Sequence, residues 1–293
     1  MRNQHNIAGV GEALWDLFPE GDLFGGAPAN FACHCHSLGA NAYVVSCLGN
    51  DKRGLDARAF LDAHGVDTSC LATSNERETG VVVVTLDEQG LPTYEIKENA
   101  AWDAIPWTRE TDVLAGKLDA VCFGSLGQRN AISRATIQTF LAATRDECLR
   151  VFDINLRQTF YTREILEESL QAASALKLND EELPTLMTIL DMSSLDEEAA
   201  LAALLGRYDL RLAILTKGDA GSLMITPTES SLASAPAITP VNTVGAGDAF
   251  TATAVMGFLD GKTLDEINQH ANAVAAWVCT QIGAAPTLPE TLS

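Results

Sequence analysis

"NTVGAGDAF" (residues 242–250) places three residues with minimal side chains, Gly245, Ala246 and Gly247, directly before one carboxylate, Asp248. The apolar run "AFTATAVMGFL" (249–259) follows at once and predicts a helix. The first N–H groups of a helix have no partner within it and carry the positive end of its dipole. Because no bulky side chain covers them here, an anion can approach these groups closely. We therefore expect residues 245–247 to form an anion hole.

A phosphoryl group that gains charge during transfer is the anion best suited to such a hole. We expect the helix dipole to hold Asp248 ionised beside it. An ionised carboxylate there can take a proton from an attacking alcohol, as phosphoryl transfer to a sugar hydroxyl requires. Short glycine motifs are weak signals, however. On this stretch alone, the alternative that Asp248 only caps a helix after a glycine turn stays open.

Strand-like runs and helical patterns alternate through the rest of the chain. The runs occupy residues 6–11, 41–49, 79–87, 118–126, 149–155, 174–179, 211–218 and 221–226, and helix-length segments such as 130–147 and 197–208 lie between several of them. This rhythm predicts an α/β fold with a mostly parallel central sheet flanked by helices. In the last helical segment, Thr263 is the expected N-cap and Gly283 the expected C-cap.

Two stretches depart from this rhythm. Residues 12–26 and 79–103 resemble strand pairs joined by Gly-containing turns, and "DEQG" (87–90) is a hairpin signal. Inserted into an α/β sheet, these strands would form a small lid over its edge. No internal repeat or flexible linker divides the chain. We therefore expect residues 1–293 to form one α/β domain that carries the lid.

The overall composition excludes several classes of partner. The formal net charge is -20 at pH 7, so nucleic acids and anionic membranes would be repelled. No eighteen apolar residues run together, and the amino terminus lacks the apolar stretch of a signal peptide. The seven cysteines are scattered, which fits reduced thiols. We expect a soluble cytoplasmic protein.

The cluster "CHCH" (33–36) raises the alternative of a metal site. If it lies on a helix, Cys33 and Cys35 stand about 200° apart around the axis, as do His34 and His36. Chelation from a helix favours ligands at i and i+4, and the sequence offers no second ligand pair. We expect these residues to be ordinary helix side chains, some of them buried.

Polar residues stand where several of the predicted strands end, and ligands of open α/β sheets bind at that edge. "VFDINLR" ends a strand with Asp153, Asn155 and Arg157, groups suited to a phosphate tail. "LTKG" ends another with Thr216, Lys217 and Gly218, where a hydroxyl and bare amides can also meet phosphates.

"NDEE" follows the run "SALKL" and contains Asn179 and Glu182. Oxygens three residues apart on a first helical turn can hold the water shell of Mg²⁺ near phosphates. An ordinary N-capped acidic helix start is the alternative for this pair.

Near the amino end, "GGAPAN" offers Gly25, Gly26 and Asn30, and Asp16 precedes it. A carboxylate and an amide around a glycine platform suit recognition of vicinal sugar hydroxyls. A turn followed by a capped helix is the alternative.

Together and in this order, these residues resemble the ribokinase-like, or PfkB, family of carbohydrate kinases. The resemblance covers essentially the whole chain. Its most specific parts are "NTVGAGDAFTATAVMGFL" (242–259) and "GGAPANFACHCHSLGANAYVVSCLGNDKRG" (25–54). "GEALWDLFP" (11–19) before "GGAPAN" looks like the opening of a fructokinase.

The resemblance implies a mainly parallel sheet between helices, with a β-lid that closes over the sugar. It implies transfer of the γ-phosphoryl group of ATP to a sugar hydroxyl, with Mg²⁺ and, in many members, K⁺. Carried onto this chain, Asp248 is the catalytic base and residues 245–247 form the anion hole. The remaining matches are sugar contacts at Asp16, Gly26 and Asn30, the Mg²⁺ and phosphate pair Asn179 and Glu182, nucleotide contacts at Thr216 and Gly218, and the adenine segment at Asn272 and Gly283.

Two positions depart from the family pattern. Asn242 stands where the family usually has an Asp that helps to hold the monovalent cation, although an amide oxygen can also ligate. Lys97 stands in the lid where fructokinases often carry an Arg. Lysine keeps the charge but lacks the planar fork, so the sugar preference can differ.

Two other classes of protein compete with the kinase. A dinucleotide-dependent dehydrogenase would use "IAGVGEAL", but Leu14 occupies the place of its third glycine. A sugar- or nucleotide-binding module would have no need of the base Asp248. We therefore predict an ATP-dependent kinase acting on the 6-hydroxyl of fructose, with ribose, nucleosides, aminoimidazole riboside and 2-keto-3-deoxygluconate as alternative acceptors. The apolar "VVVVTL" (81–86) leaves a homodimer through the lid open.

Overall fold

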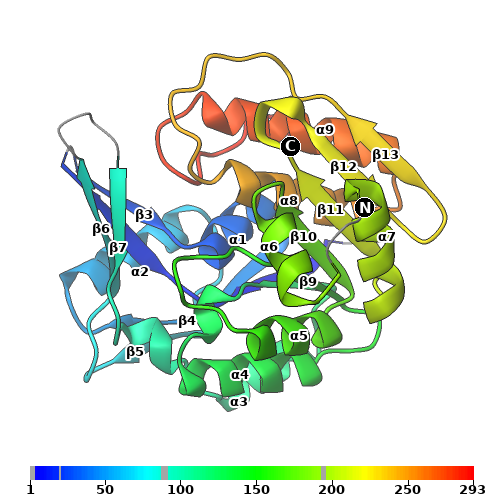
Figure 1. The fold of residues 1–293 in the computed structure, drawn as a ribbon. Coiled ribbons are helices and arrows are strands. Elements are labelled where there is room, and N and C mark those ends of the chain that lie inside the picture. Colours follow the sequence, from blue (N-terminus) through cyan, green and yellow to red (C-terminus); the bar gives the residue numbers. More distant parts are fainter. Residues whose placement is uncertain (1–3, 20, 87–91, 193–195) are drawn as a thin grey trace.

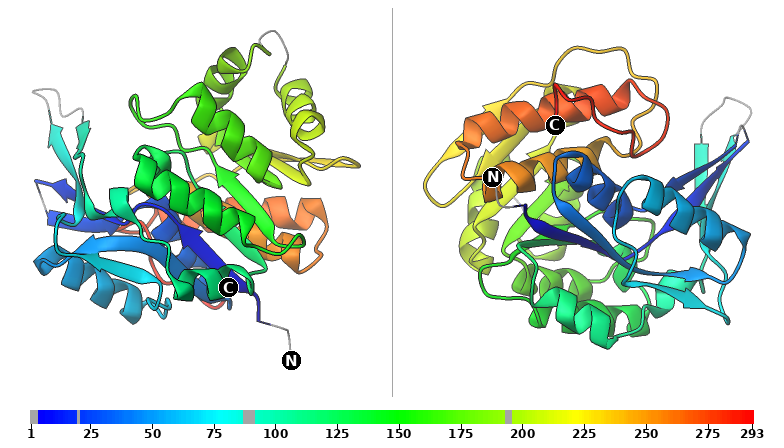
Figure 2. Two further views of the ribbon diagram at one scale, coloured as in Figure 1. Left: turned by 90° about the horizontal axis from the view of Figure 1, so that it is seen from below. Right: turned by 180° about the vertical axis from the view of Figure 1, so that it is seen from behind.

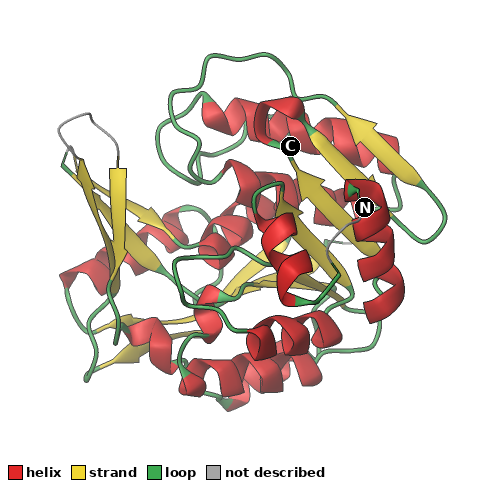
Figure 3. Ribbon diagram, in the orientation of Figure 1, coloured by secondary structure: helices red, strands yellow, loops and turns green. Residues whose placement is uncertain are grey.

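The computed structural model describes residues 4–19, 21–86, 92–192 and 196–293. A nine-stranded sheet runs through the molecule (Figure 3). Its strands lie in the order β13-β12-β11-β10-β9-β8-β1-β4-β5. The strands from β11 to β5 pair in parallel, whereas β12 and β13 are antiparallel at one edge. In chain order the strands are β1 (Asn6–Val10), β4 (Asn41–Gly49), β5 (Leu71–Ser74), β8 (Ala120–Phe123), β9 (Leu149–Asp153), β10 (Ala175–Asn179), β11 (Leu212–Thr216), β12 (Ser222–Ile225) and β13 (Ser230–Ala233).

Helices cover both faces of this sheet (Figures 1 and 2). One face packs against α1 (Ala27–Ser37), α2 (Lys52–Ala63), α8 (Ala246–Leu259) and α9 (Leu264–Cys279). The other packs against α3 (Arg109–Ala115), α4 (Ala131–Ala142), α5 (Arg163–Ala172), α6 (Glu182–Ile189) and α7 (Glu197–Tyr208). Successive strand residues alternate between the two cores, as Val151 and Phe152 do. The α/β prediction is confirmed. It was possible because strands that are buried on both faces appear in the sequence as continuous apolar runs.

Four strands form a separate small sheet in the order β3-β2-β6-β7, which stands beside the large sheet in Figure 1. Its strands are β2 (Leu14–Phe18), β3 (Gly21–Gly25), β6 (Gly80–Leu86) and β7 (Pro92–Ile96). The two strand pairs expected from the sequence are therefore present, and β2 joins them by pairing in parallel with β6. The hairpin turn expected at 87–90 lies outside the described residues.

A buried arginine ties the small sheet to the rest of the molecule. Arg129 donates from Nε and Nη2 to the two carboxylate oxygens of Asp103, both at 2.8 Å, and from Nη2 to the carbonyl oxygen of Lys97 at 2.6 Å. Its guanidinium lies 4.0 Å from the ring centre of Trp102 and 4.7 Å from that of Phe160. These contacts fix the chain where it leaves β7. They also join the short helix η1 (Ala101–Ala104), which contains Asp103, to the residue that follows the short helix η2 (Leu126–Gln128).

One helix boundary differs from the prediction. Thr263 is the N-cap of α9, as expected, and its hydroxyl accepts a hydrogen bond from the N–H group of Glu266. Gly283 is not the C-cap, because α9 ends at Cys279 and Thr280 follows as its cap. The carbonyl oxygen of Cys279 accepts from the N–H groups of Val241 and Asn242, so residues distant in the sequence pair the last carbonyl group of this helix. Across the described residues, no helix has the length and apolar character needed to cross a membrane.

Arg129→Leu tests the buried ion pair, whose two side chains are only 5% and 2% exposed. The substitution leaves Asp103 buried without its charge partner, so we expect the free energy of unfolding to fall by about 3 kcal/mol in urea. The control is Lys52→Ala, which breaks an exposed pair with Asp56 and should cost less than about 0.5 kcal/mol. Equal losses in the two variants would contradict this account of the buried pair.

Candidate active site

A cavity of about 820 Å³ lies between the carboxyl ends of the parallel strands, the small sheet and the start of α8. Parallel strands end at a common edge, so residues far apart in the sequence meet there. Among the predicted site residues, the cavity is lined by Asp16, Gly26, Asn30, Asn155, Asn179, Glu182, Thr216, Gly245, Gly247 and Asp248.

The turn at the start of α8 has the form that an anion hole requires. Gly245 is the N-cap with a φ of 82°, and a side chain there would overlap the carbonyl oxygen of Ala284. The N–H group of Ala246 donates a long bond of 3.3 Å to Thr243. Within the described part of the chain, the N–H groups of Gly245, Gly247 and Asp248 have no acceptor. Unpaired donors therefore gather at the positive end of the helix.

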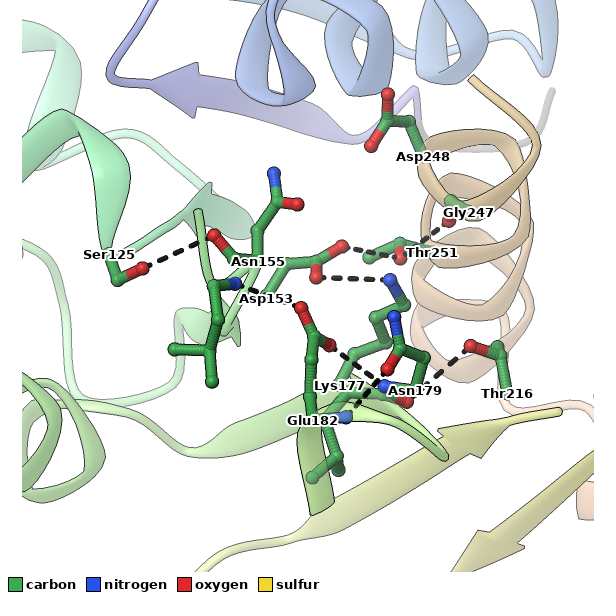
Figure 4. Close-up of polar contacts among 12 residues, drawn as sticks. Ser125, Asp153, Asn155, Lys177, Asn179, Glu182, Thr216, Gly247, Asp248 and Thr251 are labelled. Atoms are coloured by element: carbon green, nitrogen blue, oxygen red, sulfur yellow. Dashed lines mark hydrogen bonds and ion pairs between the residues drawn. The ribbon is translucent and has the colours of Figure 1, made fainter. Parts of the chain in front are cut away.

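Asp248 stands beside these donors and faces the cavity (Figure 4). Its Oδ2 accepts a hydrogen bond of 2.8 Å from Nδ2 of Asn30. Burial raises the pKa of Asp248 to about 7, the nearby Asp153 adds to this rise, and the bond from Asn30 opposes it. Burial therefore opposes the ionised form of Asp248 that we expected the helix dipole to favour. A carboxyl group with such a pKa can accept a proton near neutral pH.

Below this turn lies a buried ion pair. Lys177 Nζ is 3.1 Å from Oδ1 of Asp153, and Thr251 Oγ1 lies 3.1 Å from the other carboxylate oxygen (Figure 4). Burial opposes the charge of Lys177, but the carboxylates of Asp153, Glu182 and Asp248 raise its pKa above the ordinary value. A Cβ atom at Gly247 would come within 3.3 Å of Lys177 Nζ, so the ammonium group lies against the anion hole.

Lys177 was not among the predicted site residues. The sequence does carry a signal for it, because a charged residue stands inside the apolar strand "ALKLN" (175–179), which is buried almost throughout. Asp153 does not line the cavity and serves as the partner of Lys177, rather than as a group for a phosphate tail.

Asn179 and Glu182 form hydrogen bonds with each other and with the start of α6. Asn179 Oδ1 accepts from the N–H groups of Glu181 and Glu182, and Glu182 Oε2 accepts from the N–H group of Asn179 at 2.9 Å. Glu182 Oε1 accepts from the N–H group of Leu156. The prediction that both residues lie on a first helical turn is wrong for Asn179, which ends β10, whereas α6 begins at Glu182. The pair is a capping arrangement whose oxygens also face the cavity.

Where the cavity meets the small sheet, the acidic side chains of Asp16 and Glu12 lie near Gly26. Burial raises the pKa of Asp16 to about 6, and Arg157 opposes this rise. Gly26 has a φ of 108°, and a side chain there would press on the carbonyl of Glu12. Glu12 was not predicted as a site residue, yet it lines the cavity and is 2% exposed. Burial raises its pKa to about 7, and Glu12 Oε2 has no hydrogen-bond partner among the described residues.

The loop after β9 links this acidic end to the small sheet. Asn155 has a φ of 45°, and its carbonyl oxygen accepts from Ser125 Oγ at 3.3 Å. Gln158 Nε2 donates to the carbonyl oxygen of Tyr94 on β7 at 2.7 Å. Arg157, between them, lines the cavity. The loop therefore spans the cavity from the large sheet to the small one.

The remaining predicted residues do not line the cavity, namely Gly25, Ala246, Lys97, Gly218, Asn242, Asn272 and Gly283. Lys97 pairs with Glu95 on β7 at 2.5 Å. Asn272 is buried and donates to Ser222 and Asn268. The Oδ1 atom of Asn242 accepts from the N–H group of Val244 at 2.9 Å. Gly25 packs behind Asp16, because a Cβ atom there would come within 3.0 Å of Oδ2 of Asp16.

Comparisons with known proteins identify a family and similar folds. The family model described as "pfkB family carbohydrate kinase" matches residues 22–291. A fructokinase of Salmonella typhimurium is 31% identical over 96% of this chain and 95% of its own. An uncharacterized sugar kinase from Pyrococcus horikoshii in complex with ATP is similar with a TM-score of 0.79 at 27% identity, over 95% of this chain and 93% of that one. Fructokinase from Vibrio cholerae O395 with bound fructose, ADP and calcium gives 0.80 at 25% identity, over 98% and 96%.

Asp248→Asn tests the raised pKa through protein stability. The pKa is about 7 in the folded protein against an ordinary 3.8, so the folded state holds the proton more tightly than the unfolded chain. Asp248 therefore destabilises the fold progressively as the pH rises from about 4 to 7. We expect the variant to be more stable than wild type, by about 2 kcal/mol more at pH 8 than at pH 5 in urea titrations. The same stability difference at both pH values would contradict the raised pKa.

Proposed function

We propose that this chain, which belongs to the pfkB family of carbohydrate kinases, transfers the γ-phosphoryl group of ATP to the 6-hydroxyl of D-fructose. The observation that supports this proposal best is the position of Asp248. A carboxyl group whose pKa is about 7 stands beside unpaired N–H groups at the start of α8. A base next to an anion hole is what transfer of a phosphoryl group to an alcohol needs.

In the proposed mechanism, the sugar hydroxyl approaches Asp248 and gives its proton to the carboxylate as its oxygen attacks the phosphorus. Asn30 donates to Oδ2 of Asp248 and so orients the carboxylate. The N–H groups of Gly245 and Gly247 stabilise the charge that develops on the transferred group. Lys177, which lies against Gly247, adds a buried positive charge behind them. The positive groups are fixed before the reaction, so little reorganisation is needed.

The residues at the end of β10 fit a hydrated Mg²⁺ ion better than a directly bound one. Both oxygens of Glu182 and the Oδ1 atom of Asn179 already accept backbone hydrogen bonds. An ionised carboxylate has further lone pairs, to which water ligands of an ion can donate. Across the described ranges, no group of three or more His, Cys, Asp or Glu side chains is placed to hold a metal ion. When bound with ATP, Mg²⁺ neutralises phosphate charge.

The acceptors at the Asp16 end of the cavity support a polyhydroxyl substrate. Asp16 faces the cavity, and in the described part of the chain Glu12 Oε2 and Asn30 Oδ1 lack hydrogen-bond donors. Sugar hydroxyls can donate to the carboxylate of Asp16, which lines the cavity, whereas Glu12 Oε2 and Asn30 Oδ1 are buried from solvent. The fructose bound to the fructokinase of Vibrio cholerae favours fructose over the other acceptors. Ribose, 2-keto-3-deoxygluconate and nucleosides are the alternatives.

The small sheet has the place and the surface of a lid. Val82, Tyr94 and Ile96 turn toward the cavity from β6 and β7. Closure of this apolar wall over the sugar would exclude water and limit hydrolysis of ATP. Activation by K⁺ at Asn242 and pairing of two chains through β6 stay predictions.

ADP release, measured with Mg²⁺ and a panel of fructose, ribose, glucose, 2-keto-3-deoxygluconate and a nucleoside, tests the proposed substrate. We expect strong turnover with fructose, and a single ³¹P resonance from a phosphate on its 6-oxygen. Turnover with only another acceptor of the panel would be consistent with the mechanism but would reject fructose as the substrate. No sugar-dependent ADP release, with or without K⁺, would contradict the proposed function.

Asp248→Asn tests the base in the same assay. The amide has the shape of the carboxyl group but cannot accept the proton, so we expect kcat to fall by about 10³-fold or more, with the KM for fructose changing only slightly. The matched control is Asp56→Asn, an exposed carboxylate on α2, which should leave kcat unchanged. Turnover by Asp248→Asn within tenfold of wild type would reject Asp248 as the base.

A further inference from the structure

We propose that His34 is a positioning residue that fixes the turn at 245–247 through the carbonyl group of Ala284. The inference rests on the proposed function, because that function gives the turn its part in catalysis. His34 belongs to the "CHCH" cluster (33–36), for which the proposed mechanism otherwise has no use.

His34 makes one polar contact from inside the core. It is fully buried on α1, and its Nε2 atom lies 3.0 Å from the carbonyl oxygen of Ala284. Burial lowers the pKa of His34 to about 4, although the contact with Ala284 opposes this, so the ring is neutral near pH 7. A carbonyl oxygen only accepts, and this assigns the ring proton to Nε2. Nδ1 has no partner among the described residues, so the carbonyl group of Ala284 is the ring's one hydrogen-bond partner there.

Ala284 in turn lies directly against the catalytic turn. Its carbonyl oxygen fills the place where a Cβ atom of Gly245 would stand. Gly245 is the N-cap of α8, and its own carbonyl oxygen accepts from the N–H group of Ala249. A shift of Ala284 would therefore move the first N–H groups of the helix, which form the anion hole.

The segment that carries Ala284 needs such a contact. It follows the end of α9 at Cys279 and has no regular secondary structure, yet Ala284 is only 3% exposed. A buried carbonyl group outside a helix or sheet must find a donor elsewhere. His34 supplies that donor from a helix on the same face of the sheet.

One helix holds both parts of the proposed site. Asn30 and His34 are four residues apart on α1, so their side chains project from the same helix face. Asn30 donates to Asp248, and His34 donates to the carbonyl that abuts Gly245. The neighbouring Cys35 instead packs in the apolar core. The helix thereby sets the base and the anion hole at a constant separation.

The test compares three variants with wild type. His34→Leu removes the donor at similar volume, and His34→Gln keeps an N–H donor of similar reach. Cys35→Ala is the matched control, because it truncates a buried side chain on the same helix without touching Ala284. His34→Asn, whose amide is too short to reach Ala284, replaces the Leu variant if that one does not fold.

Amide hydrogen exchange across 246–253 tests the contact itself, with residues 149–153 as the internal reference for global opening. We expect about tenfold faster exchange in His34→Leu at residues 249–253, the first of which, Ala249, donates to the carbonyl oxygen of Gly245, and rates within about twofold of wild type in His34→Gln and Cys35→Ala. Exchange at 246–253 that does not change in His34→Leu would overturn the inference, whatever the activity.

Kinetics test the consequence of the contact. A turn misplaced by about 1 Å should lower the kcat of His34→Leu by about 10- to 100-fold, while the KM for fructose stays within about threefold and His34→Gln keeps most of the activity. An equal kcat in His34→Leu and Cys35→Ala, at ligand saturation, would show a merely structural role and reject the inference. If wild type shows no sugar-dependent turnover, the proposed function fails, and the exchange rates alone decide on His34.

Discussion

Gly245 has no room for a side chain, because the carbonyl group of Ala284 occupies that place. This close approach lets α8 begin directly beneath the cavity, with its first N–H groups uncovered. Four separate segments converge on the turn. The middle of β10 brings Lys177, the start of α1 brings Asn30, the segment after α9 brings Ala284, and α8 itself brings Asp248. The geometry of the proposed site is thus a property of the packed fold and not of the glycine motif alone.

Charge at the site is distributed in an unusual way for so acidic a chain. Asp153, Glu182 and Asp248 surround one buried ammonium group, and burial raises the pKa of Asp248 and Glu12 to about 7. Each of these groups costs stability in the empty protein. The positive end of the α8 dipole and the ammonium group of Lys177 offset that cost locally. In the proposed mechanism they attract a phosphoryl group, which the overall charge of -20 would otherwise repel. Active sites commonly lower the stability of the protein that carries them, because activity needs groups that are unfavourable for folding.

Much of this arrangement could be predicted from local patterns in the sequence. Runs of apolar residues buried on both faces predict the large sheet, and polar residues at strand ends predict its functional edge, as at Asn179 and Thr216. Features that depend on distant contacts could not be predicted in this way. Neither the parallel pairing of β2 with β6 nor the hydrogen bond from Val241 to the last carbonyl group of α9 leaves a local signal. The same holds for the burial of Asp248, which raises the pKa of its carboxyl group to about 7.

The pH dependence of kcat/KM for fructose tests the central claim most directly. If Asp248 is the base, kcat/KM should fall tenfold for each pH unit below an apparent pKa near 7, because the carboxyl group is then protonated. The same fall in kcat/KM at acidic pH should persist in Glu12→Gln, since Glu12 has a similarly raised pKa but no part in the proton transfer. A profile that stays flat down to pH 5, or a fall that disappears in Glu12→Gln, would contradict the assignment of Asp248.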